Sequence, residues 1–196
     1  NQQYPNLPEQ NRNTLVETEL QKVLREQKSQ ISQQITATSN FFKSKLQDDT
    51  GQTYLLAIDP YFWMRHAKNI LENGHAGDEI KNGVPWNNHM VAPRGRAVIY
   101  DMFHANFEAF LFKFFSFFNK NINLMAVVFY VPVLISALAV IPTFFITRKL
   151  VGNIGGIIAA IVVAIHPSFL TRTVGGFADT DAYNVMFPLF IAWLFL

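Results

Sequence analysis

The sequence predicts a mainly α protein in which a large helical external loop precedes polytopic membrane helices. Half of the residues are apolar, and the charged residues crowd into the first two thirds of the chain. Residues 124–146 contain no charge and are long enough to cross a bilayer. Because the chain starts on Asn-Gln-Gln without a methionine and stops in an apolar run at Leu196, we expect it to be a fragment of a longer protein.

The chain divides into a polar first part and an apolar second part. We expect residues 1–122 to form the first external loop and residues 123–196 to form the transmembrane region. Apolar residues recur at helical spacing from residue 14 to 46, and Thr14 with Glu17 fits a capping box at the start of this helix. Its heavily charged surface favours a packed face or a short coiled-coil arm over a membrane anchor.

A second helix of the first loop should cover residues 97–118. It contains eight phenylalanines together with Glu108 and Lys113. Such a helix is too charged to span a bilayer and too aromatic to be fully solvated. We therefore predict an interfacial helix at the level of the lipid headgroups.

The transmembrane region contains three predicted spans. They cover residues 124–146, 150–171 and 182–196, and the last is truncated. Gly152 and Gly156 form a GxxxG pair that favours the close approach of a neighbouring helix. The His166-Pro167 pair is expected to bend the second span.

A short basic turn predicts the orientation of these spans. Arg148 and Lys149 lie between the first two spans, so the positive-inside rule places them on the cytoplasmic side. The polar first part and the loop at residues 172–181 then lie on the extracytoplasmic side. Asp59 and Asp179 therefore face the same side of the membrane and could share one ion.

The loop at residues 172–181 combines an arginine, two glycines and two carboxylates. Asp179 and Asp181 are separated by one residue, so in an extended segment both project to one side and can reach one divalent cation. All-oxygen ligation favours Mg²⁺ or Mn²⁺ over zinc. Arg172 could hold a carboxylate or bind a phosphate. The alternative is a polar loop whose acids only solvate a helix end.

Asp59 is a second acidic position of interest, because it precedes Pro60 after an apolar run. An aspartate followed by proline suits a helix N-cap with the proline at the first helical position. The helix should continue to about Asn73 and stop at Gly74. From the residues alone, a cap is the favoured role for Asp59.

The loop between this helix and the interfacial helix is rich in Gly, Asn and Pro. His89, Arg94 and Arg96 could receive the anionic headgroup of a substrate. The alternative is that these three side chains are only solvated. The net charge of +2 gives no reason to expect nucleic acid as a partner.

Two stretches resemble the catalytic subunits of oligosaccharyltransferases, which are membrane glycosyltransferases of the GT-C superfamily. Ser168-Phe-Leu-Thr-Arg-Thr-Val-Gly-Gly-Phe-Ala-Asp-Thr-Asp181 resembles a short external loop of that family, most closely of its archaeal single-subunit type. Asp59-Pro-Tyr-Phe-Trp63 resembles the acidic motif of the family's first external loop. The resemblance implies transfer of an oligosaccharide from a dolichyl phosphate or pyrophosphate carrier to asparagine in Asn-x-Ser/Thr acceptors.

The resemblance also implies a role for each acidic residue, with Mn²⁺ or Mg²⁺ as the cofactor. Asp59 would bind the metal and orient the acceptor amide, and Asp179 would be the second direct ligand. Asp181 would bind the metal directly or through water, and Arg172 would support the acids. The active site would lie on the extracytoplasmic face of the cell membrane.

Parts of the family pattern have no counterpart in this sequence, and the helix at residues 14–46 departs from it. A first span, a later external loop with a glutamate and a C-terminal Trp-Trp-Asp domain are missing, so we expect the fragment alone to be inactive. Two alternatives are another polyprenyl-phosphate-sugar transferase and a non-enzymatic membrane scaffold or ion-binding subunit. The scaffold predicts that Asp59 and Asp179 lie far apart.

Overall fold

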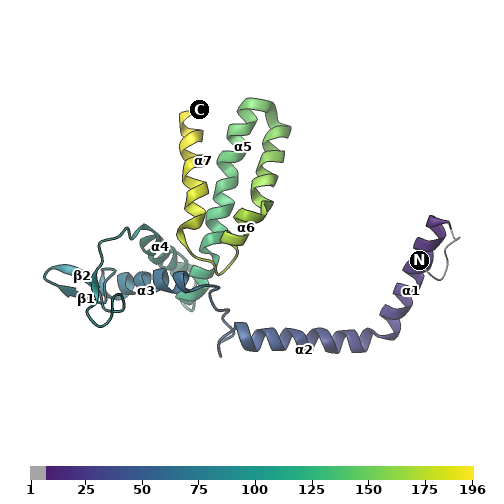
Figure 1. Ribbon diagram of the computed structural model, residues 1–196, viewed down its shortest axis with the longest axis horizontal. Coiled ribbons are helices and arrows are strands. Elements are labelled where there is room, and N and C mark those ends of the chain that lie inside the picture. Colours follow the sequence, from purple (N-terminus) through teal and green to yellow (C-terminus); the bar gives the residue numbers. More distant parts are fainter. Residues whose placement is uncertain (1–7) are drawn as a thin grey trace. The chain divides into compact units, whose positions relative to one another are not determined.

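The computed structural model describes residues 8–196, so residues 1–7 of the predicted external loop lie outside the described part (Figure 1). The chain separates into two compact units, residues 1–51 and 52–196. The boundary predicted at residue 122 was drawn from membrane topology and stays a prediction.

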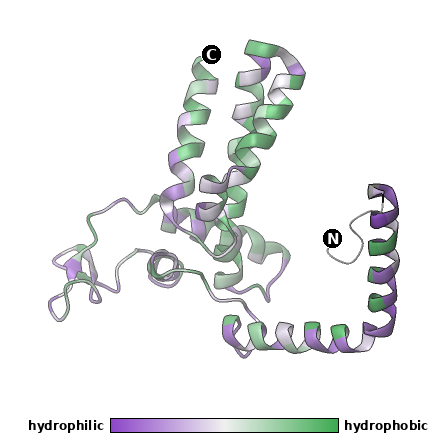
Figure 2. Cartoon of the chain, turned by 45° about the vertical axis from the view of Figure 1, so that its right-hand side comes forward, coloured by the Kyte–Doolittle hydropathy of each residue, from purple (hydrophilic) through white to green (hydrophobic). Residues whose placement is uncertain are grey.

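The first unit consists of two helices, α1 (Glu9–Glu26) and α2 (Lys28–Leu46). The backbone leaves helical angles at Gln27, so the single helix predicted here is wrong. The capping box is also wrong, because Thr14 lies inside α1 and its hydroxyl donates to the carbonyl of Gln10 over 2.9 Å. Figure 2 shows apolar residues interspersed with polar ones along both helices. The apolar side chains of α2 are all at least partly exposed.

The second unit begins with α3 (Ile58–Asn73), which ends as predicted at Gly74 in a left-handed conformation. Its N-cap residue is Ala57, without a side-chain cap. Asp59 therefore lies within the first turn, and its predicted role as the N-cap is wrong. An acid in the first turn still interacts favourably with the positive end of the helix dipole.

A small antiparallel sheet follows α3 where the sequence predicted only a loop. Its strands are β1 (Glu79–Lys81), β2 (Val84–Asn87) and β3 (Arg96–Ala97), in that order. Asn82 and Gly83 connect β1 to β2, and both have positive φ angles. Asn-Gly is the sequence that a two-residue turn of this conformation prefers, so this dipeptide was a local signal for the hairpin.

Asp78 joins the sheet to α3. Its carboxylate accepts hydrogen bonds from the side chains of Arg65 and Asn69 and from the backbone of Asn88, and it lies 3.3 Å from His89 Nδ1. Burial by itself raises the pKa of Asp78, but these hydrogen bonds outweigh it and hold the pKa well below its usual range.

Helix α4 (Phe103–Phe118) is shorter than the predicted interfacial helix because residues 97–102 are not helical. Helix α4 packs against both α3 and α5, and its buried residues are His104, Ala105, Glu108, Ala109 and Leu111. Several phenylalanines of α4 are exposed, among them Phe110, Phe114, Phe117 and Phe118. The interfacial position of this helix stays a prediction.

Helix α5 (Leu124–Ile165) has 42 residues and folds back on itself at Gly152, which has a φ of +85° (Figure 1). In the described part of the chain, α5 is the single helix that is long and apolar enough to cross a membrane. A Cβ on Gly156 would lie 2.9 Å from the carbonyl oxygen of Phe144, so this glycine lets the two arms approach closely. The prediction that these glycines allow a neighbouring helix to approach is therefore supported for Gly156. It is wrong for Gly152, which forms the turn.

The chain bends again at His166-Pro167, as predicted, because α5 ends at Ile165 and α6 (Pro167–Thr173) starts a new direction. A short 3₁₀ helix, η1 (Thr180–Ala182), leads into α7 (Tyr183–Phe195). Helix α7 packs along α5, and both contribute to the main apolar core. Figure 1 shows α6 and the start of α7 at the end of α5 that lies opposite to its turn.

Candidate active site

Two glycines fix the loop between α6 and α7 on the first arm of α5. The backbone N–H of Gly176 donates to the carbonyl of Phe129 over 2.8 Å. A Cβ on Gly175 or Gly176 would lie 2.6 Å or 2.9 Å from the Phe129 ring, and Gly176 has a φ of +89°. Only glycine therefore allows the loop to lie on this ring.

The same loop binds the segment that precedes α3. The backbone N–H of Leu56 donates to the carbonyl of Gly176 over 3.0 Å. Leu55 is buried together with Ala178 and Val128 of α5. These contacts place the beginning of α3, and with it Asp59, beside this loop, which is called the acidic loop below (residues 172–181).

Trp63 connects the two acidic motifs. It follows Asp59 by four residues, so both side chains lie on one face of α3. Its indole Nε1 donates a hydrogen bond of 3.1 Å to Asp179 Oδ1, across 116 positions of the sequence. The carboxylate of Asp59 is exposed and has no hydrogen-bond or ion-pair partner among the described residues.

Asp179 and Asp181 do not form the extended pair that the spacing predicted. Asp179 is extended, and its Oδ1 also accepts from the backbone N–H of Thr180 over 2.7 Å. Asp181 lies in η1, with its Oδ2 3.3 Å from Arg172 Nη1. The geometric argument for two parallel carboxylates is therefore wrong, because the chain turns into the 3₁₀ helix between them.

Arg172 is held by two interactions on the surface of the loop. It pairs with Asp181, and its guanidinium lies 5.5 Å from the centre of the Phe177 ring. Because the side chains of Arg172 and Asp181 are 61% and 35% exposed, the pair contributes little to stability. Arg172 lies where it can orient the carboxylate of Asp181.

The described residues do not bring three His, Cys, Asp or Glu side chains together in a cluster that could hold a metal ion. Carboxylate oxygens are the donors that Mg²⁺ and Mn²⁺ prefer, so the chemistry of Asp59, Asp179 and Asp181 suits these ions. Trp63 and Arg172 each engage one oxygen of this set. These three acids therefore supply suitable donors without forming a complete centre, and the shared ion stays a prediction.

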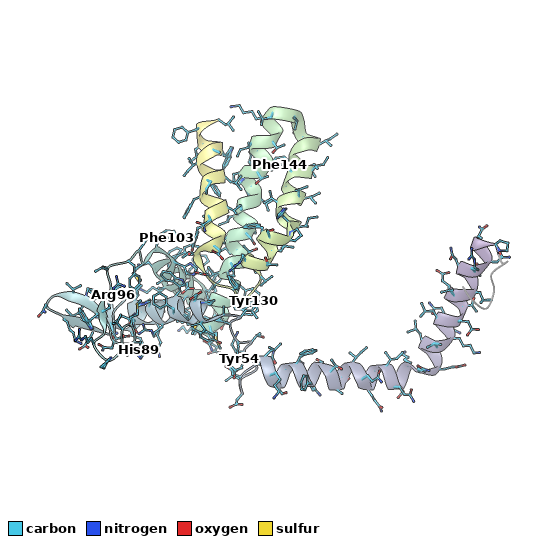
Figure 3. The ribbon with its side chains drawn as sticks, viewed as in Figure 1. Tyr54, His89, Arg96, Phe103, Tyr130 and Phe144 are labelled. Atoms are coloured by element: carbon cyan, nitrogen blue, oxygen red, sulfur yellow. The ribbon has the colours of Figure 1, made fainter. Side chains whose placement is uncertain are left out.

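His89, Arg94 and Arg96 belong to the sheet region and not to the acidic loop. Arg96 lies opposite Asn87 in the sheet, and His89 Nδ1 lies 3.0 Å from Arg65 Nη1. Figure 3 shows His89 and Arg96 well separated from Tyr130 on α5. In the described structure none of the three forms a hydrogen bond or ion pair with Asp59, Asp179 or Asp181, and their role in binding a donor stays a prediction.

The sequence analysis missed a buried polar cluster next to Trp63. His104 Nδ1 lies 2.9 Å from the hydroxyl of Tyr183, and its Nε2 lies 3.1 Å from Glu108 Oε1. Burial raises the pKa of Glu108, and the nearby His104 opposes that shift. A histidine and a glutamate four residues apart in a phenylalanine-rich helix were the available signal.

Comparison with known proteins identifies the family of this chain. Residues 29–196 match the family described as "Oligosaccharyl transferase STT3, N-terminal". The chain belongs to the STT3 oligosaccharyl transferase family. The match begins within α2, so α1 lies outside the matched region.

Two archaeal relatives match this chain, and both are named dolichyl-phosphooligosaccharide-protein glycotransferase. The protein of Methanococcus voltae is 33% identical over 164 residues, which cover 81% of this chain and 18% of the relative. The protein of Methanocaldococcus jannaschii is 32% identical over 176 residues, with the same two coverages. The chain thus spans less than a fifth of the length of these relatives.

A solved structure shows the same fold. It is the archaeal oligosaccharyltransferase AglB from Archaeoglobus fulgidus, in complex with an inhibitory peptide and a dolichol-phosphate. It matches with a TM-score of 0.58 at 22% identity, over 74% of this chain and 16% of AglB. The predicted mainly α, GT-C-like fold is therefore confirmed.

Proposed function

We propose that the protein containing this STT3 region transfers an oligosaccharide from a dolichyl phosphate or pyrophosphate carrier to asparagine in Asn-x-Ser/Thr acceptors. Membership of the family and the names of the two archaeal relatives support this proposal. AglB, which shares the fold, binds a peptide and a dolichol-phosphate, and these belong to the same two classes of substrate.

The hydrogen bond between Trp63 and Asp179 is the observation on which the proposal mainly rests. It brings the motif of the first loop and the acidic loop to one place, although they are distant in the sequence. A non-enzymatic scaffold would not require this arrangement. The match to the STT3 family argues against a different polyprenyl-phosphate-sugar transferase.

We also propose that the protein is multi-pass and works on the extracytoplasmic face of the cell membrane. Arg148 and Lys149 lie near the turn of α5, and the acidic loop lies at the opposite end of this helix (Figure 1). Basic residues favour the cytoplasmic side, so the acidic loop would lie outside.

The reaction requires activation of a poor nucleophile, because the lone pair of an amide nitrogen is delocalised into its carbonyl. The exposed carboxylate of Asp59 can accept a hydrogen bond from the acceptor amide and so weaken this conjugation. Two further acids would line the same site. Trp63 would orient Asp179, and Arg172 would orient Asp181. His89, Arg94 and Arg96 would contact the phosphate of the donor.

Mn²⁺ or Mg²⁺ is the cofactor that we propose for this site. Asp59, Asp179 and Asp181 would supply ligands, completed by water or by other parts of the protein. When bound, such an ion supplies positive charge that stabilises a leaving phosphate.

The test uses the full-length protein in membranes, a lipid-linked glycan extract and a fluorescent Asn-x-Thr peptide. Glycosylation of the peptide lowers its mobility in a gel. We expect transfer with Mn²⁺, and loss of transfer with a chelator and in Asp59→Ala and Asp179→Ala. Asp49→Ala, which removes an exposed acid of the first unit, should retain activity.

Two outcomes would contradict parts of this proposal. If wild-type protein transfers nothing while a control enzyme glycosylates the peptide with the same extract, the proposed reaction is wrong. If transfer persists in the chelator, the proposed metal is wrong while the reaction remains.

A further inference from the structure

His104 is a polar residue in a place where packing alone would favour an apolar one. It lies on the buried face of α4 and is 2% exposed, and its neighbour Glu108 is fully buried. Burying ionisable groups costs free energy that apolar side chains of similar volume would not cost. Their position next to Trp63 suggests that they serve the acidic loop.

One contact of His104 fixes the C-terminal end of this loop. Its Nδ1 lies 2.9 Å from the hydroxyl of Tyr183, the first residue of α7. Tyr183 directly follows η1 and is separated from Asp181 by a single residue, Ala182. The hydrogen bond therefore fixes where α7 begins and, with it, the position of the turn that holds Asp181.

A second contact acts on Asp179, which lies four residues before Tyr183. The rings of His104 and Trp63 pack edge to face, with their centres 5.6 Å apart and their planes at 86°. Trp63 donates from its indole to Asp179 Oδ1. Because the indole plane is held by the His104 ring, its N–H stays directed at the carboxylate.

Glu108 sets the orientation of the His104 ring. Its Oε1 lies 3.1 Å from His104 Nε2, which is an ion-pair distance without the alignment of a hydrogen bond. Neither oxygen of Glu108 has another hydrogen-bond partner among the described residues. A proton on Nε2 facing this carboxylate leaves Nδ1 free to accept the hydroxyl proton of Tyr183.

We propose that His104 is a positioning residue of the active site. It holds Asp179 through Trp63 and Asp181 through Tyr183, while Glu108 orients its ring. This inference rests on the proposed transferase function, and it adds a single buried side chain that acts on both acids of the loop, Asp179 and Asp181. No substrate needs to touch His104 for this role.

The experiment measures kcat and KM for the peptide in the full-length protein carrying His104→Asn, Trp63→Phe or both. Asparagine lacks the ring that packs on Trp63 and reaches less far toward Tyr183. We expect each single variant to lower kcat about tenfold with little change in KM, as for residues that orient a functional group. His104 and Trp63 both act on Asp179 through the indole hydrogen bond. The kcat of the double variant should therefore fall by far less than the hundredfold expected if the two effects were independent.

Two further variants separate positioning from a loss of stability. Ile135→Ala removes a buried side chain of the apolar cluster that also contains Tyr183, without removing a contact to His104 or Trp63 that the structure shows. It should lower the melting temperature, and its effect on kcat should be independent of that of Trp63→Phe. Tyr183→Phe removes one hydroxyl, keeps the ring, and should lower kcat with little loss of melting temperature.

The results distinguish failure of this inference from failure of the proposed function. Independent effects of His104→Asn and Trp63→Phe, or an unchanged kcat in Tyr183→Phe, would overturn the positioning role while wild-type transfer remained. No transfer by wild type, when a control enzyme uses the same extract, would overturn the transferase proposal and this inference together.

Discussion

Trp63 and Asp179 are joined by a hydrogen bond of 3.1 Å from the indole Nε1 to the carboxylate Oδ1. The bond links α3 to the acidic loop, two elements separated by the whole of α4 and α5. Asp59 lies one turn before Trp63 on α3, so this contact, together with the hydrogen bond from Leu56 to Gly176, brings the two acidic motifs together.

Trp63→Phe should lower transfer more than it lowers stability. The change removes the indole N–H but retains an aromatic ring, so we expect a loss of about tenfold in kcat and of about 1 kcal/mol in unfolding free energy. Peptide glycosylation and thermal melting in detergent measure the two effects. Trp193→Phe, at a ring that stacks on Phe145, is the control and should retain transfer. Equal activity of the two variants would contradict the role of the hydrogen bond.

Gly176→Ala should destabilise the protein more than Gly74→Ala. Both glycines have positive φ angles, so both changes add backbone strain of about 1 kcal/mol. At Gly74 a Cβ would meet no atom within 4 Å, whereas at Gly176 it would lie 2.9 Å from the Phe129 ring. Melting temperatures of the two variants test this difference, and equal losses would show that the ring contact is unimportant.

Arg172→Gln should reduce transfer at nearly unchanged stability. The pair with Asp181 is largely exposed, so its loss should cost less than about 1 kcal/mol, but Asp181 would lose its orienting partner. Arg148→Gln is a matched control, because Arg148 also lies over a phenylalanine ring, that of Phe144, near the other end of α5. If both variants retain full transfer, Arg172 does not support the acidic site.

Asp78→Asn should destabilise the protein at pH 7 by about 2 kcal/mol, because the native state stabilises the charged carboxylate by several hydrogen bonds. The lowered pKa of Asp78 means that this stabilisation is complete above the ordinary carboxyl pKa and declines as the pH falls below about 4. The difference in melting temperature between wild type and variant should therefore narrow toward low pH. Asp49→Asn, at an exposed acid, should change stability little. If the difference in melting temperature widened at low pH, the stabilising role of the charged Asp78 carboxylate would be wrong.

Glu108→Gln should have the opposite effect and stabilise the protein at pH 7. Burial raises the pKa of Glu108, so the charged form costs stability at neutral pH, and this cost disappears below the ordinary carboxyl pKa of about 4. We expect the variant to gain roughly 1 kcal/mol at pH 7, with the gain vanishing toward pH 4. Thermal melting at both pH values tests this, with Glu72→Gln, at an exposed acid, as the control. A loss of stability at pH 7 would show that the pair with His104 outweighs the cost of burial.

Local patterns in the sequence were sufficient for most helices and for the family. A glycine after an amphipathic run predicted the end of α3 at Gly74, and His166-Pro167 predicted the bend between α5 and α6. These features depend on backbone preferences within a few residues, which the sequence states directly. The Asn82-Gly83 hairpin also depends on such a local preference, because both residues adopt positive φ angles.

The geometry of the candidate site depended on tertiary structure. The spacing of Asp179 and Asp181 predicted an extended pair, but the chain turns into η1 because Tyr183 and Ala182 pack into the α5 core. The spacing of His104 and Glu108 was a local signal, but it did not reveal their partners. Trp63 and His104 each contact residues far away in the sequence. The sequence by itself determined which residues are acidic, apolar or flexible, whereas only the packing of α3, α4 and α7 on α5 decided which of them meet. Such contacts depend on side-chain complementarity between distant segments, and no local pattern specifies it.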